Sequence, residues 1–159
     1  MELKKGFSLI ELTIVIGLIA LLTLAISAIM LTSIGTSNRI RTATRVKQAG
    51  SFVIDQLQAI LRSAKSVTSC DSVLATITVV NQDGTSSTIR ESGGRIASDA
   101  TFFISPENMT VSSYSLICEP SDTEPTLVKV LFDMKNSQVT RESENPTLHF
   151  ETSINLRNE

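Results

Sequence analysis

The side chains that could do chemistry are few, and their spacing limits what that chemistry could be. Cys70 and Cys118 lie far apart, and His149 is the only histidine. Zinc, haem and iron–sulfur sites need several such ligands at short spacings, so the sequence predicts no metal centre and no cofactor. A nucleophile–base pair cannot be placed from one histidine near the C-terminus, and we therefore predict that the chain is not an enzyme.

The two cysteines leave two interpretations open. They could form a disulfide if the C-terminal part of the chain lies outside the cytoplasm, in an oxidising compartment. They could equally be two unpaired, partly buried thiols, because the sequence does not show that Cys70 and Cys118 meet.

Three weaker signals are interpreted without assigning them a function. Asp122 and Glu124 lie in the acidic loop SDTE, but two carboxylates lack the ligand series of an EF-hand-like calcium loop. His149 falls in an alternating segment and is expected to serve packing or the surface. Residues 108–110 match a glycosylation sequon, but such triplets are common by chance, and we interpret this one as a surface loop.

One carboxylate stands out by its surroundings. Glu11 precedes residues 12–31, which carry no charge. A helix of that length spans about 30 Å, which is the thickness of one hydrocarbon core. The run is also longer than the apolar region of a secretory signal peptide, which has about 7–15 residues. We therefore expect a retained transmembrane helix. A carboxylate at membrane depth is costly, so it is usually partnered and functional.

The elements after this helix are predicted from periodicity. The first proline is Pro106, so no proline stops a helix before it. An apolar stripe with spacings of three and four predicts an amphipathic helix over residues 36–67, either continuous with the first or hinged near residues 35–38. The stripe consists of Val46, Ala49, Val53, Leu57, Ile60, Leu61 and Ala64.

Residues 68–159 are predicted to form a β-rich head. Strand-like segments separated by turn signals predict about five or six antiparallel strands, one face of which receives the amphipathic helix. The TFFI segment is expected to be a buried strand rather than an exposed adhesive patch. The strand candidates are residues 73–80, 85–90, 101–104, 109–119, 127–134 and 147–157. The fold class is α+β.

Charge is distributed unevenly. Residues 1–67 carry eight Lys/Arg against three Asp/Glu, and residues 68–159 carry six against thirteen. An acidic head argues against nucleic-acid binding there. The basic cluster of the N-terminal part could face anionic lipid headgroups or an acidic partner.

The opening sequence KKG-FSLIE-L, followed by the apolar run, resembles the N-terminus of type IV pilins and the pilin-like proteins of type II secretion and DNA uptake. The resemblance implies a leader peptide over residues 1–6, cleavage between Gly6 and Phe7 by a prepilin peptidase, and methylation of Phe7. It implies that Glu11 pairs with the new α-amine of a neighbouring subunit during filament assembly, which would compensate both charges at membrane depth.

The resemblance also implies an organisation and a set of partners. Residues 7–35 would form the transmembrane and filament-core helix, residues 36–67 the amphipathic helix, and residues 68–159 the head. Partners would be other pilin subunits, the peptidase, an assembly platform in the inner membrane and the lipid bilayer. The chain would sit in the inner membrane with its head outside the cytoplasm, and then in a pilus or pseudopilus.

Two details qualify the assignment within the family. Many major pilins have a proline where this chain has Ala28, which favours a minor pilin or pseudopilin. The C-terminal segments TLVKVLFDM and HFETSINLRN also resemble the ends of minor pilins with larger, sheet-rich heads. Adhesion, motility, DNA uptake and secretion machines share this N-terminus and are not distinguished.

The topology signals conflict. Lys4 and Lys5 precede the apolar run, but Arg39, Arg41, Arg45 and Lys47 follow it, so the positive-inside rule alone favours a cytoplasmic head. The peptidase motif requires the opposite. We hypothesise that the basic helix of one subunit meets the acidic head of another. The alternatives are a non-polymerising bitopic membrane protein that presents an extracytoplasmic β-rich binding domain, and an anchored extracytoplasmic enzyme.

Overall fold

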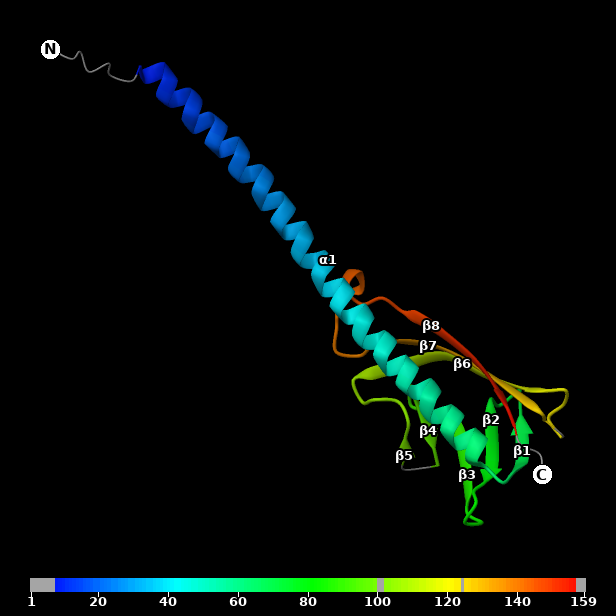
Figure 1. Cartoon of the computed structure of the whole chain (residues 1–159). Helices are drawn as coiled ribbons and strands as arrows, with labels where there is room; N and C mark the ends of the chain where they lie inside the picture. The colour runs from blue at the N-terminus through cyan, green and yellow to red at the C-terminus, as the bar shows by residue number, and fades with distance from the viewer. Residues whose placement is uncertain (1–7, 100–101, 124, 157–159) are drawn as a thin grey trace. The chain divides into compact units, whose positions relative to one another are not determined.

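The N-terminal third of the chain forms one uninterrupted helix. The computed structural model describes residues 8–99, 102–123 and 125–156, and the following account concerns these residues. Helix α1 covers Leu9–Ser63 and passes through Gly35 without a break, so the hinged alternative is wrong (Figure 1). It ends at Ser63 rather than at residue 67, because the Lys65 amide already donates to the Val80 carbonyl at 2.8 Å and begins sheet pairing.

Contacts divide the chain into two compact units, with the boundary between Asn38 and Arg39. The first unit contains the apolar half of α1. The second contains the remainder of α1 and all the strands. The sequence placed the end of the first helical segment at residue 35, three residues before this boundary.

The second unit is built on two antiparallel sheets, so the α+β prediction is confirmed. The larger sheet has the order β1-β2-β3-β4-β5, and the smaller has the order β6-β7-β8. Their strands are β1 Ser66–Asp71, β2 Thr76–Val80, β3 Ser86–Ser92, β4 Arg95–Ser98, β5 Phe102–Phe103, β6 Met109–Glu119, β7 Leu127–Asn136 and β8 Leu148–Asn155. A short 3₁₀ helix, η1, covers Glu142–Glu144.

The described residues contain eight strands, where the sequence predicted five or six. The additional ones are β1, whose polar sequence SVTSCD lacks an apolar alternation, and β4, which has only four residues. The prediction of a strand from residue 73 is also wrong. The Asp71 carboxylate accepts the amides of Val73 and Leu74 at 2.9 and 2.8 Å, which closes a turn and delays β2 to Thr76.

The TFFI segment is a further correction. Strand β5 contains only Phe102 and Phe103, and both rings are exposed rather than buried, whereas Ile104 of the same segment is buried as predicted. The Arg95 guanidinium lies over the Phe103 ring, 4.1 Å from its centroid. Residue 101 lies outside the described residues.

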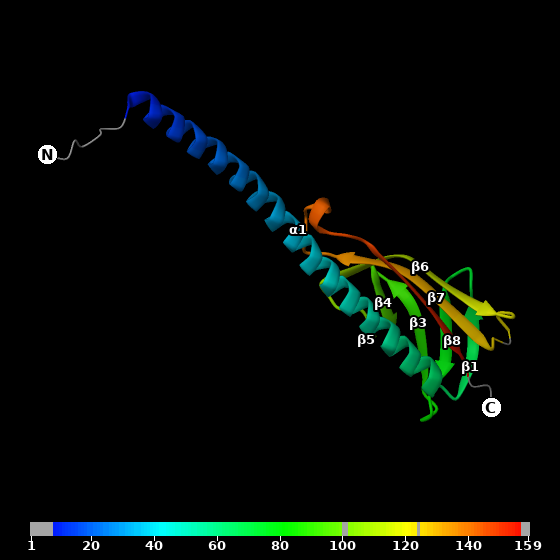
Figure 2. The ribbon, with the colours of Figure 1, turned by 45° about the horizontal axis from the view of Figure 1, so that its top comes forward.

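The core of the second unit joins α1 to both sheets (Figure 2). The predicted helical stripe is largely correct: four of its members are fully buried, Ala64 is buried, and Ala49 and Ile60 are partly buried. The buried face of α1 also includes two residues outside the predicted stripe, the polar Thr42 and the small Gly50. The fully buried members are Val46, Val53, Leu57 and Leu61.

Gly50 allows α1 to approach β8 closely. A Cβ atom built at Gly50 would collide with the ring of Phe150, which stacks on Phe132 with centroids 5.2 Å apart. Two turns further on, Gln58 donates to the Thr152 hydroxyl at 3.0 Å. This seam fixes which face of the helix is turned toward the smaller sheet.

Candidate functional site

The apolar half of α1 presents its side chains on the outside. Within this half, the structure buries none of residues 8–38, and Gly35 alone is intermediate. By length and composition, α1 could cross a membrane. This is consistent with a single-pass membrane protein, because an unburied aliphatic surface of this length needs lipid or other helices around it.

Five hydroxyl groups of this half donate to backbone carbonyls of the helix itself. Thr23 donates to the Ile19 carbonyl and Ser27 to the Thr23 carbonyl, both at 2.8 Å. Thr13, Thr32 and Thr36 make equivalent bonds. Such back-bonding hides donors that would be costly in hydrocarbon, so these residues are compatible with an apolar environment.

Glu11 is the one ionisable residue between Leu9 and Asn38. It lies in the first turn of α1, where the helix dipole favours a negative charge, and its amide donates to the Ser8 carbonyl at 3.0 Å. Its carboxylate is exposed and makes no ion pair with any residue that the structure describes. The predicted cleavage site, Gly6 and Phe7, lies outside the described residues.

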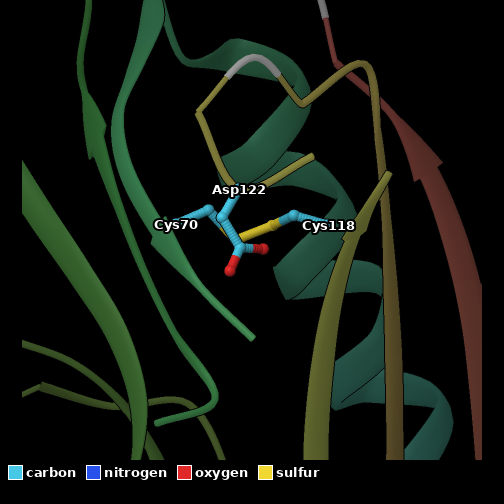
Figure 3. Close-up of side chains that lie close together, drawn as sticks. All are labelled: Cys70, Cys118 and Asp122. Atoms are coloured by element: carbon cyan, nitrogen blue, oxygen red, sulfur yellow. A yellow bond between two sulfur atoms is a disulfide. The ribbon is translucent and has the colours of Figure 1, made fainter. Parts of the chain in front are cut away.

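The structure joins Cys70 of β1 to Cys118 of β6 in a disulfide, with Cα atoms 6.6 Å apart. The bond ties the larger sheet to the smaller one. Asp122, on the β6–β7 loop, lies beside it (Figure 3). These three residues are not a metal site, because sulfurs bonded to each other cannot act as thiolate ligands.

The Asp122 carboxylate has a structural partner instead. It accepts the Ser72 amide at 3.2 Å and the Ser72 hydroxyl at 2.5 Å. The Ser72 hydroxyl in turn accepts the Cys118 amide at 3.1 Å. This network holds the β6–β7 loop against the β1–β2 turn. Glu124, the other carboxylate of the predicted acidic loop, lies outside the described residues.

The remaining candidates show no catalytic geometry in the described part of the chain. His149 is exposed on β8, and its Nδ1 lies 2.8 Å from the Asp133 carboxylate on β7. Asn108 is half-buried just before β6 rather than fully exposed as a surface loop would be. An open groove is lined by the β1–β2 turn, Arg90 and Tyr114, but the Tyr114 hydroxyl is buried and offers a ligand nothing.

The chain was compared with models of known protein families, with curated proteins and with solved structures, and none of the three comparisons gives a match. The assignment of a function therefore rests on the residues and their geometry.

Sequence reasoning missed Gly50 and Ser72 as positioning residues. Gly50 interrupts the apolar stripe at the position where an aliphatic residue is expected, and a glycine on a buried helical face signals close approach of another element. Ser72 leaves no comparable signal, because a serine in a turn is common and its bond to Asp122 joins residues 50 positions apart.

Proposed function

We propose that this chain is a structural subunit of a type IV pilus or a type II secretion-like filament, in the manner of a minor pilin or pseudopilin. Its helix holds it in the membrane as a precursor, and cleavage after Gly6 then prepares it for assembly. Subunits associate through the apolar half of α1, and the β-rich head is displayed outside the cytoplasm. The protein thus acts as a building block of the filament, through association with other subunits.

The observation that carries the proposal is the isolation of Glu11. One carboxylate without a described partner lies at the start of a helix whose next twenty residues carry no charge. Burial of a lone carboxylate costs several kcal/mol, so the position makes sense if a cation arrives from outside the described residues. The α-amine of a cleaved neighbouring subunit is a cation of that kind, and the pair would fix the axial register between subunits.

The disulfide supports the proposed location of the head outside the cytoplasm. Disulfides persist in oxidising compartments and are rare in the cytosol. A head stapled by Cys70–Cys118 therefore suits an extracytoplasmic location, although four Lys/Arg follow the apolar run.

The first experiment is the N-terminal sequence and intact mass of the full chain from membranes of cells with and without an active prepilin peptidase. We expect a methylated Phe7 as the first residue only where the peptidase is active. A Gly6→Leu variant should remain uncut. If the chain still begins at Met1 beside a co-expressed, correctly processed pilin, the non-polymerising bitopic membrane protein becomes the better assignment.

Assembly is tested by Glu11→Gln, which keeps the shape and removes the charge. Because it leaves an amine unpaired at membrane depth, we expect its recovery in sheared filaments to fall by about tenfold or more, with normal cleavage. Glu107→Gln, at an exposed acid of the head, is the matched control and should assemble normally. Wild-type recovery of Glu11→Gln would contradict the proposed pairing.

A further inference from the structure

A group of four cations on α1 has no role in the assembly argument above. Arg39, Arg41, Arg45 and Lys47, here called the basic collar, are all exposed. The three ion pairs found among the described residues lie elsewhere, in the sheets and η1. No Asp or Glu occurs between Glu11 and Asp55, so no acid on the same helix lies within one turn of a collar residue.

The collar surrounds the helix rather than forming a stripe. At about 100° per residue, Lys47 lies roughly 80°, Arg41 roughly 200° and Arg45 roughly 240° around the axis from Arg39. A protein partner that docks on one side would meet only part of such a set. A layer of charge that borders the exposed faces of the helix could meet all of it.

The start of the collar fits the headgroup layer of a membrane. Arg39 is five residues after Ile34, the last exposed aliphatic residue before it. Five helical residues rise about 8 Å, which brings Arg39 to about the outer edge of the polar layer on one side of a bilayer, whereas the thirteen residues to Lys47 rise about 20 Å and place it beyond that layer. Long basic side chains also reach along the helix to place their charge in that layer.

The acidic residues of the head are largely occupied, which weakens a second copy of this chain as the partner. Three of them form ion pairs, and five accept hydrogen bonds from neutral donors, which keep the charge of the carboxylate but hold it in place within the head. They are Asp71, Asp83, Glu91, Asp99, Glu119, Asp122, Asp133 and Glu144. The other acids of the head that the structure describes are Glu107 in the turn before β6, Glu142 in η1 and Glu151 in β8, all exposed.

We propose that the basic collar binds the anionic phospholipid headgroups of the leaflet on the side of the head, and so holds the subunit upright in the membrane before assembly. The interaction rests on a spanning helix and requires neither cleavage nor a filament. Each Lys or Arg near an anionic surface contributes about a fivefold preference at low salt, and salt weakens it.

The test uses the full chain in mixed micelles of phosphatidylcholine and phosphatidylglycerol, with native mass spectrometry to count the retained lipids. We expect the wild type to retain phosphatidylglycerol preferentially. The triple variant Arg39→Gln, Arg41→Gln, Arg45→Gln should lower that preference by about tenfold or more. The matched control, Lys65→Gln, Arg90→Gln, Lys135→Gln, removes the same charge from exposed positions of the second unit and should leave the preference unchanged.

A charge-keeping variant, Arg39→Lys, Arg41→Lys, Arg45→Lys, guards against misfolding and should retain the wild-type preference. Equal losses in the collar and control variants would overturn the proposal, as would no preference in the wild type. A collar variant that keeps its lipid preference but loses self-association in pure phosphatidylcholine would overturn it in favour of a protein partner. None of these results depends on cleavage at Gly6, so they test the collar separately from the filament proposal.

Discussion

The two halves of α1 share one continuous helical backbone, but their apolar side chains differ in burial. Before Arg39, apolar side chains occur on every face of the helix and the described ones remain exposed. After it, the buried positions recur at spacings of three and four and pack against two sheets. Helix formation is common to both halves. What differs is whether this chain or its surroundings supply the burial.

This difference sets where substitutions should matter. In the second half, a change at a buried position alters the core of the chain itself. In the first half, the same change alters a surface that the structure leaves exposed. Matched substitutions in the two halves therefore test the comparison directly, when stability is measured on the full chain in detergent.

The largest expected effect comes from the bond that joins the sheets on which the second half packs. Removal of the Cys70–Cys118 disulfide frees a loop of 48 residues in the unfolded chain. The chain-entropy relation gives a loss of about 4 kcal/mol in the free energy of unfolding. The double variant Cys70→Ser, Cys118→Ser should lose hydrogen-exchange protection over residues 39–63 and keep it over residues 12–31. Equal losses in both halves would break the distinction between them.

Truncation of a buried leucine should have the next largest effect. Leu57 is fully buried, and Leu57→Ala should reduce the free energy of unfolding by about 3 kcal/mol through lost burial and a cavity. Leu18 is 56% exposed, so Leu18→Ala should change it by less than about 0.5 kcal/mol in detergent. Thermal unfolding followed by circular dichroism measures both. A Leu18→Ala loss as large as that of Leu57→Ala would mean that the first half is packed against the chain's own head.

The glycines offer a sharper version of the same test. Gly50→Ala places a methyl group against the Phe150 ring, which cannot simply swing away because it stacks on Phe132. We expect a loss of about 2 kcal/mol in unfolding free energy. Gly35→Ala meets nothing within 4 Å and should be neutral or stabilise the helix by up to about 1 kcal/mol.

A rescue variant separates steric overlap from other causes. Phe150→Leu shortens the side chain that faces Gly50, so the combination with Gly50→Ala should lose less stability than the sum of the two single changes. Strict additivity would show that the Gly50–Phe150 contact is not what limits the approach of α1 to β8.

The sequence predicts this fold well where a pattern is long and poorly where tertiary contacts decide. The α1 stripe and strands β6 and β7 follow from periodicity over ten or more residues. Strand β1 does not, because its polar residues are held by pairing with β2 rather than by an apolar face of their own. Phe102 and Phe103 are aromatic residues in a β-rich segment, which favours burial, yet they lie on a two-residue edge strand.

The candidate sites also differ in whether a local pattern or a tertiary contact reveals them. Glu11 is conspicuous from sequence because its anomaly is local: a charge at the edge of an apolar run. The pairing of Cys70 with Cys118 and the bond between Ser72 and Asp122 join residues about 50 positions apart, and nothing local selects them over other arrangements. The basic collar lies between these cases. Its residues are evident from sequence, but the absence of an ion pair with any described acid becomes evident only once those acids are placed.

The smallest expected effect concerns a polar atom that is buried in the head. No described residue in the first half of α1 is buried in this way. Burial raises the pKa of Tyr114 above its ordinary value of 10.0, and its hydroxyl lacks a hydrogen-bond partner within the described residues. Tyr114→Phe removes that unsatisfied group, so we expect a gain of up to about 1 kcal/mol in unfolding free energy near neutral pH.

The sign of the pH dependence follows from the direction of that shift. Above about pH 10 the unfolded chain loses the phenolic proton while the folded chain keeps it, so stability should fall as pH rises. Tyr114 is the only tyrosine and the chain has no tryptophan, so tyrosinate absorbance reports this one group. We expect the absorbance to rise together with unfolding in the wild type. A rise near pH 10 in the folded protein would instead show that solvent reaches the hydroxyl, and that the head is open at the β6 bulge where Tyr114 lies.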